Sequence, residues 1–221
     1  MRTRKLDLSV YGVLDPARTR GRPLAELADA AIRGGVTFLQ FRDKTQNTRQ
    51  FLDGAYEVAQ VARAHNVPLV INDRVDIAFA VDADGVHLGD EDMPAAQARR
   101  LLGEDAIIGQ TIHSVHEAQT FPIEDADCFG VGAVYATPSK QRDVPPIGPE
   151  GFAEIRRSLA KLAPGKPVVG IAGITWENCG PVMAAGADGV AVISDIFMAD
   201  DVEAAAKRLA SAVRRKGEAA A

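Results

Sequence analysis

The sequence is poor in the residues that mark several classes of protein. Its two cysteines, Cys128 and Cys179, lie far apart and without CxxC spacing, so we expect neither a disulfide framework nor a zinc site. No apolar run reaches the length of a transmembrane helix, which predicts a protein that does not use a membrane. A net charge of −5 over 221 residues provides no basic surface for nucleic acid.

The start of the chain has basic residues but lacks the apolar stretch of a secretory signal. Arg2, Arg4 and Lys5 come first, and no apolar segment of the required length follows them, so we expect a cytoplasmic protein without a signal peptide. The composition, 47% hydrophobic and 25% charged, suits one globular domain over residues 1–221 with a core at about residues 8–215. The sequence allows a homo-oligomer but does not specify one.

Short apolar runs alternate with amphipathic segments along the chain. Runs of this kind are typical of strands buried in a parallel sheet, whereas the segments between them show helical periodicity. The expected strands cover residues 8–14, 36–41, 68–71, 85–88, 106–109, 128–134, 167–171 and 189–193. The expected helices cover residues 23–33, 48–66, 75–81, 94–102, 151–162, 175–185 and 200–215, with another that follows Ser114. Residues 121–127 have no clear pattern, and residues 135–149 form the longest expected loop.

The alternation predicts the fold class. Strands that alternate with helices form parallel sheets with right-handed crossovers. Eight such units in a chain of this length predict an α/β fold, a single-domain (β/α)8 TIM barrel. The alternative is an open doubly wound sheet, which would require a glycine-rich loop after its first strand. Residues 14–18, with the sequence LDPAR, are not such a loop.

Two aspartates follow neighbouring expected strands and are candidates for a metal site. Asp73 comes after the strand at residues 68–71, beside Asn72, and Asp92 comes after the strand at residues 85–88. Ligands bind at the carboxyl ends of parallel strands, and Mg²⁺ often takes only one or two protein carboxylates. Either aspartate could instead be a helix N-cap. For Asp92 the two interpretations weigh about equally, whereas for Asp73 we favour the metal.

Cations, hydroxyls and glycines follow the other strands, and a closed barrel would bring them to one mouth. Such a set suits phosphate groups whose charge Mg²⁺ partly neutralises. Lys44, Lys140 and the metal would hold a pyrophosphate, whereas Gly173 and Ser194 occupy the recurrent phosphate site of these barrels. Taken singly, each lysine is more simply a solvated side chain, so the prediction depends on convergence. The remaining candidates are Gln40, Arg42, Asn72, Thr111, Thr137 and Ser139.

Two histidines lie close to these positions. His87, between Val86 and Leu88, is expected to be a packing residue of the barrel interior. His113 could be a catalytic base or only the end of a loop, and we weigh the loop end higher. Ser114 is expected to cap the helix that follows it, with Glu117 completing a capping box.

Six segments together resemble the thiamine phosphate synthase family. Each motif alone is weakly specific, but six motifs in this order and at this spacing are strongly specific. Together they extend over nearly the whole chain. They are residues 40–44 (QFRDK), 72–76 (NDRVD), 85–89 (GVHLG, followed by Asp92 and Pro94), 137–140 (TPSK), 170–174 (GIAGI) and 187–194 (ADGVAVIS). The resemblance implies a TIM-type barrel that joins 4-amino-5-hydroxymethyl-2-methylpyrimidine diphosphate to a thiazole phosphate. Its products would be thiamine phosphate and pyrophosphate, with Mg²⁺ as the cofactor.

The resemblance also implies roles for individual residues. Lys44, Lys140 and Thr111 would be catalytic, because the two lysines, with Mg²⁺, would stabilise the charge that grows on the leaving pyrophosphate. Asp73 and Asp92 would bind Mg²⁺. The pyrimidine diphosphate would contact Gln40, Phe41, Arg42, Asp43, Lys44, Asn72, Thr111 and Lys140. The thiazole phosphate would contact Thr137, Pro138, Ser139, Gly173, Ile193 and Ser194.

The chain departs from the family's usual pattern at a few of these positions. Phe41 replaces Leu and Asp90 replaces Gln, while Thr111 and Ser139 exchange one hydroxyl residue for another, so we expect activity to be retained.

Two other functions are alternatives to the synthase. One is that of the related thiazole tautomerase, which would use His113 but would not need the diphosphate and metal residues. The other is a non-catalytic barrel that binds phosphorylated ligands. We favour the synthase.

Overall fold

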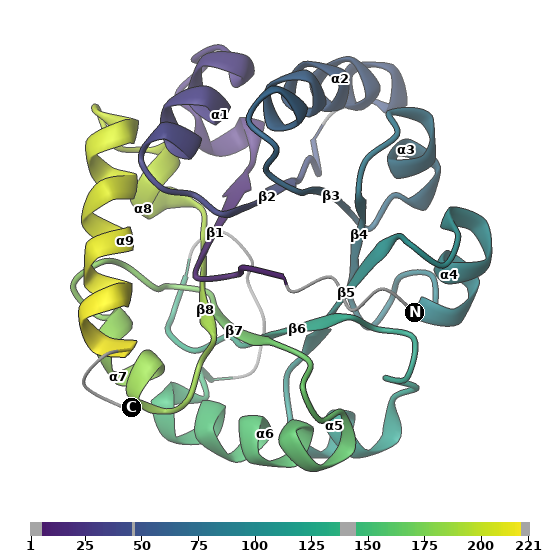
Figure 1. Ribbon diagram of the computed structural model, residues 1–221, viewed down its shortest axis with the longest axis vertical. Helices are drawn as coiled ribbons and strands as arrows, with labels where there is room; N and C mark the ends of the chain where they lie inside the picture. Colours follow the sequence, from purple (N-terminus) through teal and green to yellow (C-terminus); the bar gives the residue numbers. More distant parts are fainter. Residues whose placement is uncertain (1–5, 46, 138–144, 218–221) are drawn as a thin grey trace.

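The protein is a closed barrel of eight parallel strands inside a ring of helices, which confirms the predicted TIM barrel (Figure 1). The computed structural model describes residues 6–45, 47–137 and 145–217. Neighbouring strands pair in chain order, and β1 (Val10–Leu14) closes the barrel on β8 (Gly189–Val192). Among the described residues, no helix has the length and apolar character that crossing a membrane would require.

The elements alternate as expected. The other strands are β2 (Phe38–Phe41), β3 (Leu69–Asn72), β4 (Gly85–Leu88), β5 (Ile107–Ile112), β6 (Cys128–Val131) and β7 (Val168–Ile171). The helices are α1 (Leu24–Arg33), α2 (Thr48–Ala64), α3 (Val75–Ala80), α4 (Ala95–Leu102), α5 (Val115–Thr120), α6 (Gly148–Leu162), α7 (Cys179–Ala184), α8 (Ser194–Phe197) and α9 (Val202–Gly217), with a 3₁₀ helix η1 (Pro16–Arg18) after β1.

Several boundaries differ from the predicted ones. β5 runs on to Ile112 because it pairs with β4 as far as Gln110 and with β6 as far as Ile112, so Thr111 lies in the strand and not after it. The strand expected at residues 128–134 ends at Val131, and α6 begins at Gly148, before the expected residue 151. The helix expected from residue 175 begins only at Cys179. The four residues of α8 form a helix that the sequence did not predict.

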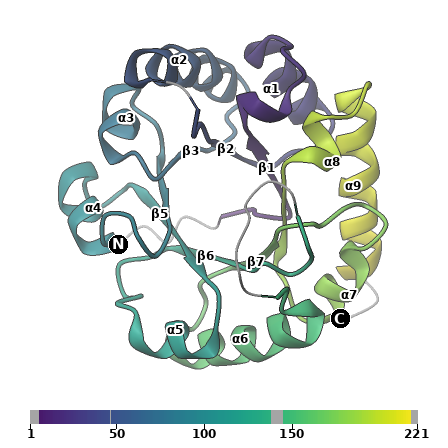
Figure 2. The same ribbon diagram turned by 180° about the vertical axis from the view of Figure 1, so that it is seen from behind.

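Side chains on successive strand residues point to opposite faces, and this alternation divides the core into two layers. The outer layer lies between the strands and the helices and includes Leu14, Phe41 and Ile71. The inner layer fills the barrel. Its residues are Leu8, Tyr11, Val13, Phe38, Val70, Ile107, Cys128, Val169 and Ala191. Figure 1 shows the end where the strands begin, crossed by the segment before β1, and Figure 2 shows the opposite end.

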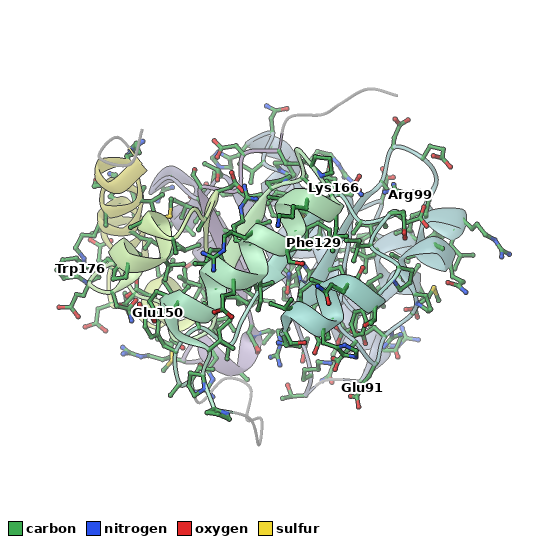
Figure 3. The ribbon with its side chains drawn as sticks, turned by 90° about the horizontal axis from the view of Figure 1, so that it is seen from below. Glu91, Arg99, Phe129, Glu150, Lys166 and Trp176 are labelled. Atoms are coloured by element: carbon green, nitrogen blue, oxygen red, sulfur yellow. The ribbon has the colours of Figure 1, made fainter. Side chains whose placement is uncertain are left out.

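A polar side chain just before each even-numbered strand forms a hydrogen bond with the backbone near the start of the preceding strand. We call these the strand-fastening contacts. In each case a side-chain oxygen accepts a backbone N–H, so the contact repeats at an interval of two strands. The pairs are Thr37 with Val10 (3.2 Å), Asp84 with Leu69 (2.9 Å), Asp127 with Ile108 (2.8 Å) and Asp188 with Val168 (2.8 Å). Arg99 reinforces one of them by donating to Asp127 over 2.7 Å, and Figure 3 shows Arg99 at this end of the barrel.

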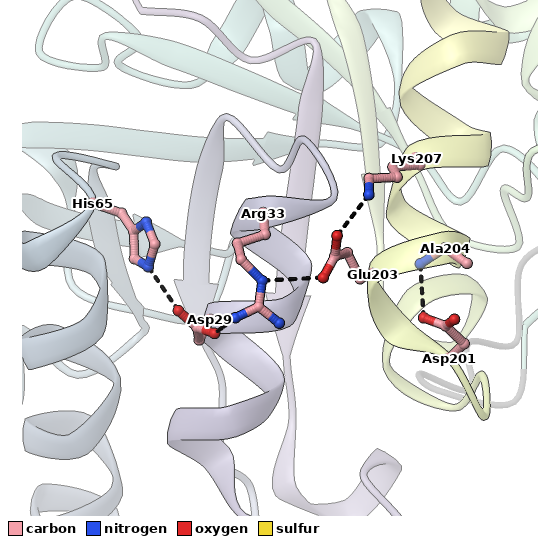
Figure 4. Close-up of polar contacts among 7 residues, drawn as sticks. All are labelled: Asp29, Arg33, His65, Asp201, Glu203, Ala204 and Lys207. Carbon is pink, nitrogen blue, oxygen red and sulfur yellow. Dashed lines mark hydrogen bonds and ion pairs between the residues drawn. The ribbon is translucent and has the colours of Figure 1, made fainter.

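A chain of polar contacts on the outer surface joins α1, α9 and the residue that follows α2. His65, just after α2, contacts Asp29 on α1 (2.8 Å), and Arg33 contacts both Asp29 and Glu203 on α9 (Figure 4). The backbones approach closely there, because a Cβ on Gly34 would lie 2.5 Å from the carbonyl oxygen of Glu203. The absence of a side chain at Gly34 therefore lets α9 pack against α1.

Removing one of the strand-fastening contacts should lower the stability of the protein. Asp84→Ala removes the acceptor of the Leu69 N–H at the start of β3 and leaves a partly buried donor unpaired. We expect the free energy of unfolding, measured by urea denaturation, to fall by about 1–3 kcal/mol. Asp105→Ala, which removes an exposed carboxylate, is the control and should change it by less than about 0.5 kcal/mol. Equal effects of the two substitutions would show that the contact contributes nothing.

Candidate active site

A cavity of about 400 Å³ opens where the strands end, and the predicted residues converge on it. Its walls come from the ends of the barrel strands and from the loops that follow them. Of the predicted site residues, those that line it are Gln40, Arg42, Lys44, Asn72, Asp73, Asp92, Thr111, Thr137, Gly173, Ile193 and Ser194. A second hollow of similar volume, between α5 and α6, contains none of them.

Two predicted residues point away from this cavity. Phe41 faces the outer layer, where its ring packs edge-on against Phe51 at 5.5 Å, because it alternates with the inward-facing Gln40. The carboxylate of Asp43 accepts the backbone N–H of Thr45 (2.9 Å) and shapes the turn after β2. The predictions for Pro138, Ser139 and Lys140 lie outside the described residues.

The two candidate metal ligands lie together and cap no helix. The carboxyl groups of Asp73 and Asp92 are within hydrogen-bonding reach, and the pKa of Asp92 is raised, first by burial and then by Asp73. Asp92 accepts the N–H of Gly89 (2.7 Å), and neither α3 nor α4 has a side-chain cap, so the N-cap alternative is wrong for both aspartates. Two adjacent oxygen donors of this kind suit a hard cation. Among the described residues, no group of three or more acidic, histidine or cysteine side chains could hold a metal.

The cations of the cavity wall are held by carboxylates. Lys44, about half exposed, forms an ion pair with Asp73. Arg42 forms an ion pair with Asp15, whose side chain is only 3% exposed and also accepts the N–H of Ala17 (3.0 Å) at the start of η1. The buried Asp15 fixes the guanidinium, whereas the exposed Lys44 can exchange Asp73 for another anion.

Both histidines reach the cavity, in different settings. His87 is 5% exposed inside the barrel, which confirms it as an interior residue. The Nδ1 atom of His113 contacts the carbonyl oxygen of Gly132, and the backbone N–H of His113 donates to the Glu117 carboxylate (2.7 Å). Ser114 caps α5 by accepting the N–H of Glu117 (3.0 Å), as predicted.

The loops after β7 and β8 are braced against each other. Asn178 accepts the N–H of Thr175 (2.7 Å) and donates to the carbonyl oxygen of Gly173 (2.9 Å), which holds residues 173–178 as a loop. The backbone of Gly173 is left-handed (φ 66°), and a Cβ there would lie 2.5 Å from the carbonyl oxygen of Ala136. Asp195 accepts the N–H of Trp176 (3.2 Å) and connects the two loops. Burial raises the pKa of Asp195.

Sequence reasoning missed four residues that shape the site, namely Tyr11, Asp15, Asn178 and Asp195. The Thr175-x-x-Asn178 spacing is the only local signal for the brace, and it was obscured by the helical pattern of residues 175–185. Tyr11 and Asp15 lie on and just after the first strand, in a segment that matches no binding motif. Their partners are far away in sequence, so only the folded barrel identifies them.

Comparison with known proteins gives consistent matches. A family model described as "Thiamine monophosphate synthase" matches residues 10–196. A thiamine-phosphate synthase of Natronomonas pharaonis is 48% identical over 94% of this chain and 95% of its own length, and one of Chloroflexus aurantiacus is 44% identical over 94% of each. The solved structure of a thiamine phosphate pyrophosphorylase from Pyrococcus furiosus superposes with a TM-score of 0.83, at 35% identity over 96% of this chain and 98% of that one.

The Lys44–Asp73 ion pair predicts competition with a divalent cation. Lys44→Met removes a unit charge beside the two aspartates, which at this distance is worth ~1–4 kcal/mol. We expect Mn²⁺, titrated without any phosphate ligand and followed by electron paramagnetic resonance, to bind at least about fivefold more tightly. Lys161→Met on α6 is the matched control and should leave Mn²⁺ binding unchanged. If Lys44→Met also has no effect, the two aspartates do not form the cation site.

Proposed function

Because the chain belongs to the thiamine monophosphate synthase family, we propose that it joins 4-amino-5-hydroxymethyl-2-methylpyrimidine diphosphate to a thiazole phosphate and releases pyrophosphate. One observation carries the proposal. A single cavity has an acidic pair and two cations on the β1–β4 side and braced glycine loops on the β7–β8 side. It can therefore hold two phosphorylated molecules at once. We further propose that the chain acts in the cytoplasm on these small molecules, without nucleic acid or a membrane.

The pyrimidine diphosphate occupies the side formed by β2 to β5. Gln40, Asn72 and Thr111 face the ring, while Arg42 and Lys44 face the diphosphate. We assign Lys140, which lies outside the described residues, to the same diphosphate from the family resemblance alone. Phe41 and Asp43 act indirectly, since Phe41 anchors β2 in the outer layer and Asp43 shapes the turn that carries Lys44. In this arrangement Lys44 leaves Asp73 and pairs with the phosphate oxygens.

Asp73 and Asp92 fit Mg²⁺ by their chemistry and their proximity. They provide adjacent carboxylate oxygens. Burial, followed by the neighbouring Asp73 carboxyl, raises the pKa of Asp92, and a divalent cation between the two would favour their charged forms. When bound, Mg²⁺ supplies positive charge beside the diphosphate. Asp73 is held in place by its backbone N–H, which donates to the carbonyl oxygen of His87 over 2.8 Å.

The thiazole phosphate occupies the side formed by β6 to β8. Backbone N–H groups at Gly173, Ile193 and Ser194 surround the recurrent phosphate position of such barrels, and Thr137 adds to the wall. We assign Pro138 and Ser139, which lie outside the described residues, to the same ligand from the family resemblance alone. The Asn178 brace keeps these groups oriented before the ligand arrives, so little ordering is required on binding.

In the reaction, the bond between the pyrimidine methylene carbon and the diphosphate oxygen breaks first. Arg42, Lys44 and Lys140 stabilise the negative charge that develops on the departing pyrophosphate. The pyrimidine-stabilised cation that remains is attacked by the thiazole nitrogen, and the two halves of the cavity hold these atoms in line. No protein nucleophile is required, and both cysteines are buried away from the cavity.

The test is an assay of the purified protein with both substrates. We expect thiamine phosphate and pyrophosphate to form in equal amounts and to require Mg²⁺. Asp73→Ala and Asp92→Ala should each lower turnover about 100-fold or more and raise the Mg²⁺ concentration required, because each removes a cation ligand. Asp76→Ala, an exposed acid on α3, is the control. Binding of both substrates without pyrophosphate release would favour the non-catalytic barrel.

His113 separates the synthase from the tautomerase alternative. Its Nδ1 atom is engaged by the carbonyl oxygen of Gly132, and the coupling reaction requires no proton transfer from it. We expect His113→Ala to retain the coupling rate to within about threefold, as does the exposed control His116→Ala. Loss of coupling with His113→Ala alone would assign a catalytic proton transfer to His113.

A further inference from the structure

A continuous hydrogen-bonded chain of four side chains crosses the floor of the cavity. Gln40 Nε2 lies 2.6 Å from Tyr11 Oη, Tyr11 Oη lies 3.4 Å from His87 Nδ1, and His87 Nε2 lies 3.0 Å from Thr111 Oγ1. These residues come from β2, β1, β4 and β5, so the chain spans half of the barrel. Three of them line the cavity, whereas Tyr11 lies beneath it and is 1% exposed.

The chemistry of these four side chains determines which atom donates and which accepts in each hydrogen bond. An amide nitrogen can only donate, so Tyr11 Oη accepts from Gln40, and the single phenolic hydrogen is left for His87 Nδ1. The hydrogen of the imidazole then sits on Nε2 and is donated to Thr111 Oγ1. Burial raises the pKa of Tyr11 well above its usual value, which keeps the phenol protonated as this order requires.

Packing holds the chain in place. The His87 ring fills the space left by two inward-facing glycines, since a Cβ on Gly109 would lie 2.4 Å from Nδ1 and one on Gly130 would lie 3.3 Å from Cε1. The Tyr11 ring packs edge-on against Phe38 at a centroid distance of 4.7 Å. Both rings are closely packed, which favours the observed ring positions and the order of hydrogen bonds that they allow.

We propose that Tyr11 and His87 are positioning residues that select a 4-aminopyrimidine over a 4-oxopyrimidine, by fixing Gln40 as an acceptor and Thr111 as a donor toward the ligand. Because Gln40 Nε2 donates one of its two hydrogens to Tyr11, the orientation of the amide is fixed, and Oε1 is the acceptor that it presents to the ligand. An exocyclic amino group donates to this oxygen, whereas a carbonyl at the same ring position would face it with two opposed lone pairs. The inference rests on the proposed function and names the feature of the substrate that the site reads.

The direct test compares the binding of the 4-amino and 4-oxo pyrimidine diphosphates by calorimetry in the presence of Mg²⁺. The protein should bind the 4-amino compound about 100-fold more tightly, since mispairing a buried polar group is costly. Tyr11→Phe frees the Gln40 amide to turn over and should reduce this preference at least tenfold. Tyr56→Phe, which removes an exposed hydroxyl that donates to Ala80, is the control and should keep it. An unchanged preference in Tyr11→Phe overturns the proposal.

A second measurement needs neither ligand nor turnover. The ¹⁵N spectrum of His87 should show a neutral ring with its hydrogen on Nε2. In Gln40→Glu, the carboxylate accepts from Tyr11, so Nδ1 of His87 loses its donor and the ring should shift toward the Nδ1–H form. A hydrogen on Nδ1 in the unsubstituted protein overturns the inference. A protein that binds the 4-amino diphosphate selectively but forms no thiamine phosphate would refute the proposed function and leave this inference standing.

Discussion

The pairing of β1 with β8 is the constraint on which the rest of the structure depends. Once the sheet is closed, each strand has two neighbours and one inward face, so the position of a residue along its strand decides whether its side chain faces the helices or the barrel interior. The segment from Gln40 to Lys44 shows the effect. Gln40, Arg42 and Lys44 reach the cavity, while Phe41 and Asp43 support them from outside.

The fold and the location of the site could be predicted from the sequence, because apolar runs, helical periodicity and strand order are local signals. Parallel strands all end on the same side, so the residues that follow them had to converge. Strand alternation also predicts that Gln40 and Phe41 face opposite sides of the sheet, whereas the family resemblance treats residues 40–44 as one binding segment. The Asn178 brace and the Tyr11 contacts could not be predicted in this way, since their geometry depends on loop conformation and on partners distant in sequence.

Each of the two described cations that line the cavity is paired with a carboxylate. Lys44 is paired with Asp73 and Arg42 with Asp15, so the two cations that we propose to face phosphate are kept in position without a large excess of positive charge. The two pairs differ in burial, and this difference separates their roles. The Arg42–Asp15 pair is a fixed part of the wall, whereas the Lys44–Asp73 pair sits at the open side, where an arriving anion can replace the carboxylate. A protein with a net charge of −5 can therefore carry the anion site that we propose.

The contacts that fasten the strand starts divide the barrel into four units, each made of an odd-numbered strand and the even-numbered strand after it. A cut in the chain after β2, β4 or β6 leaves every such contact within one piece, whereas a cut after an odd-numbered strand separates a carboxylate or hydroxyl from its partner. New chain ends introduced by circular permutation should therefore be tolerated best at the seams between these units. In this sense the barrel consists of four two-strand units, each held together by its own hydrogen bond between a side chain and the backbone.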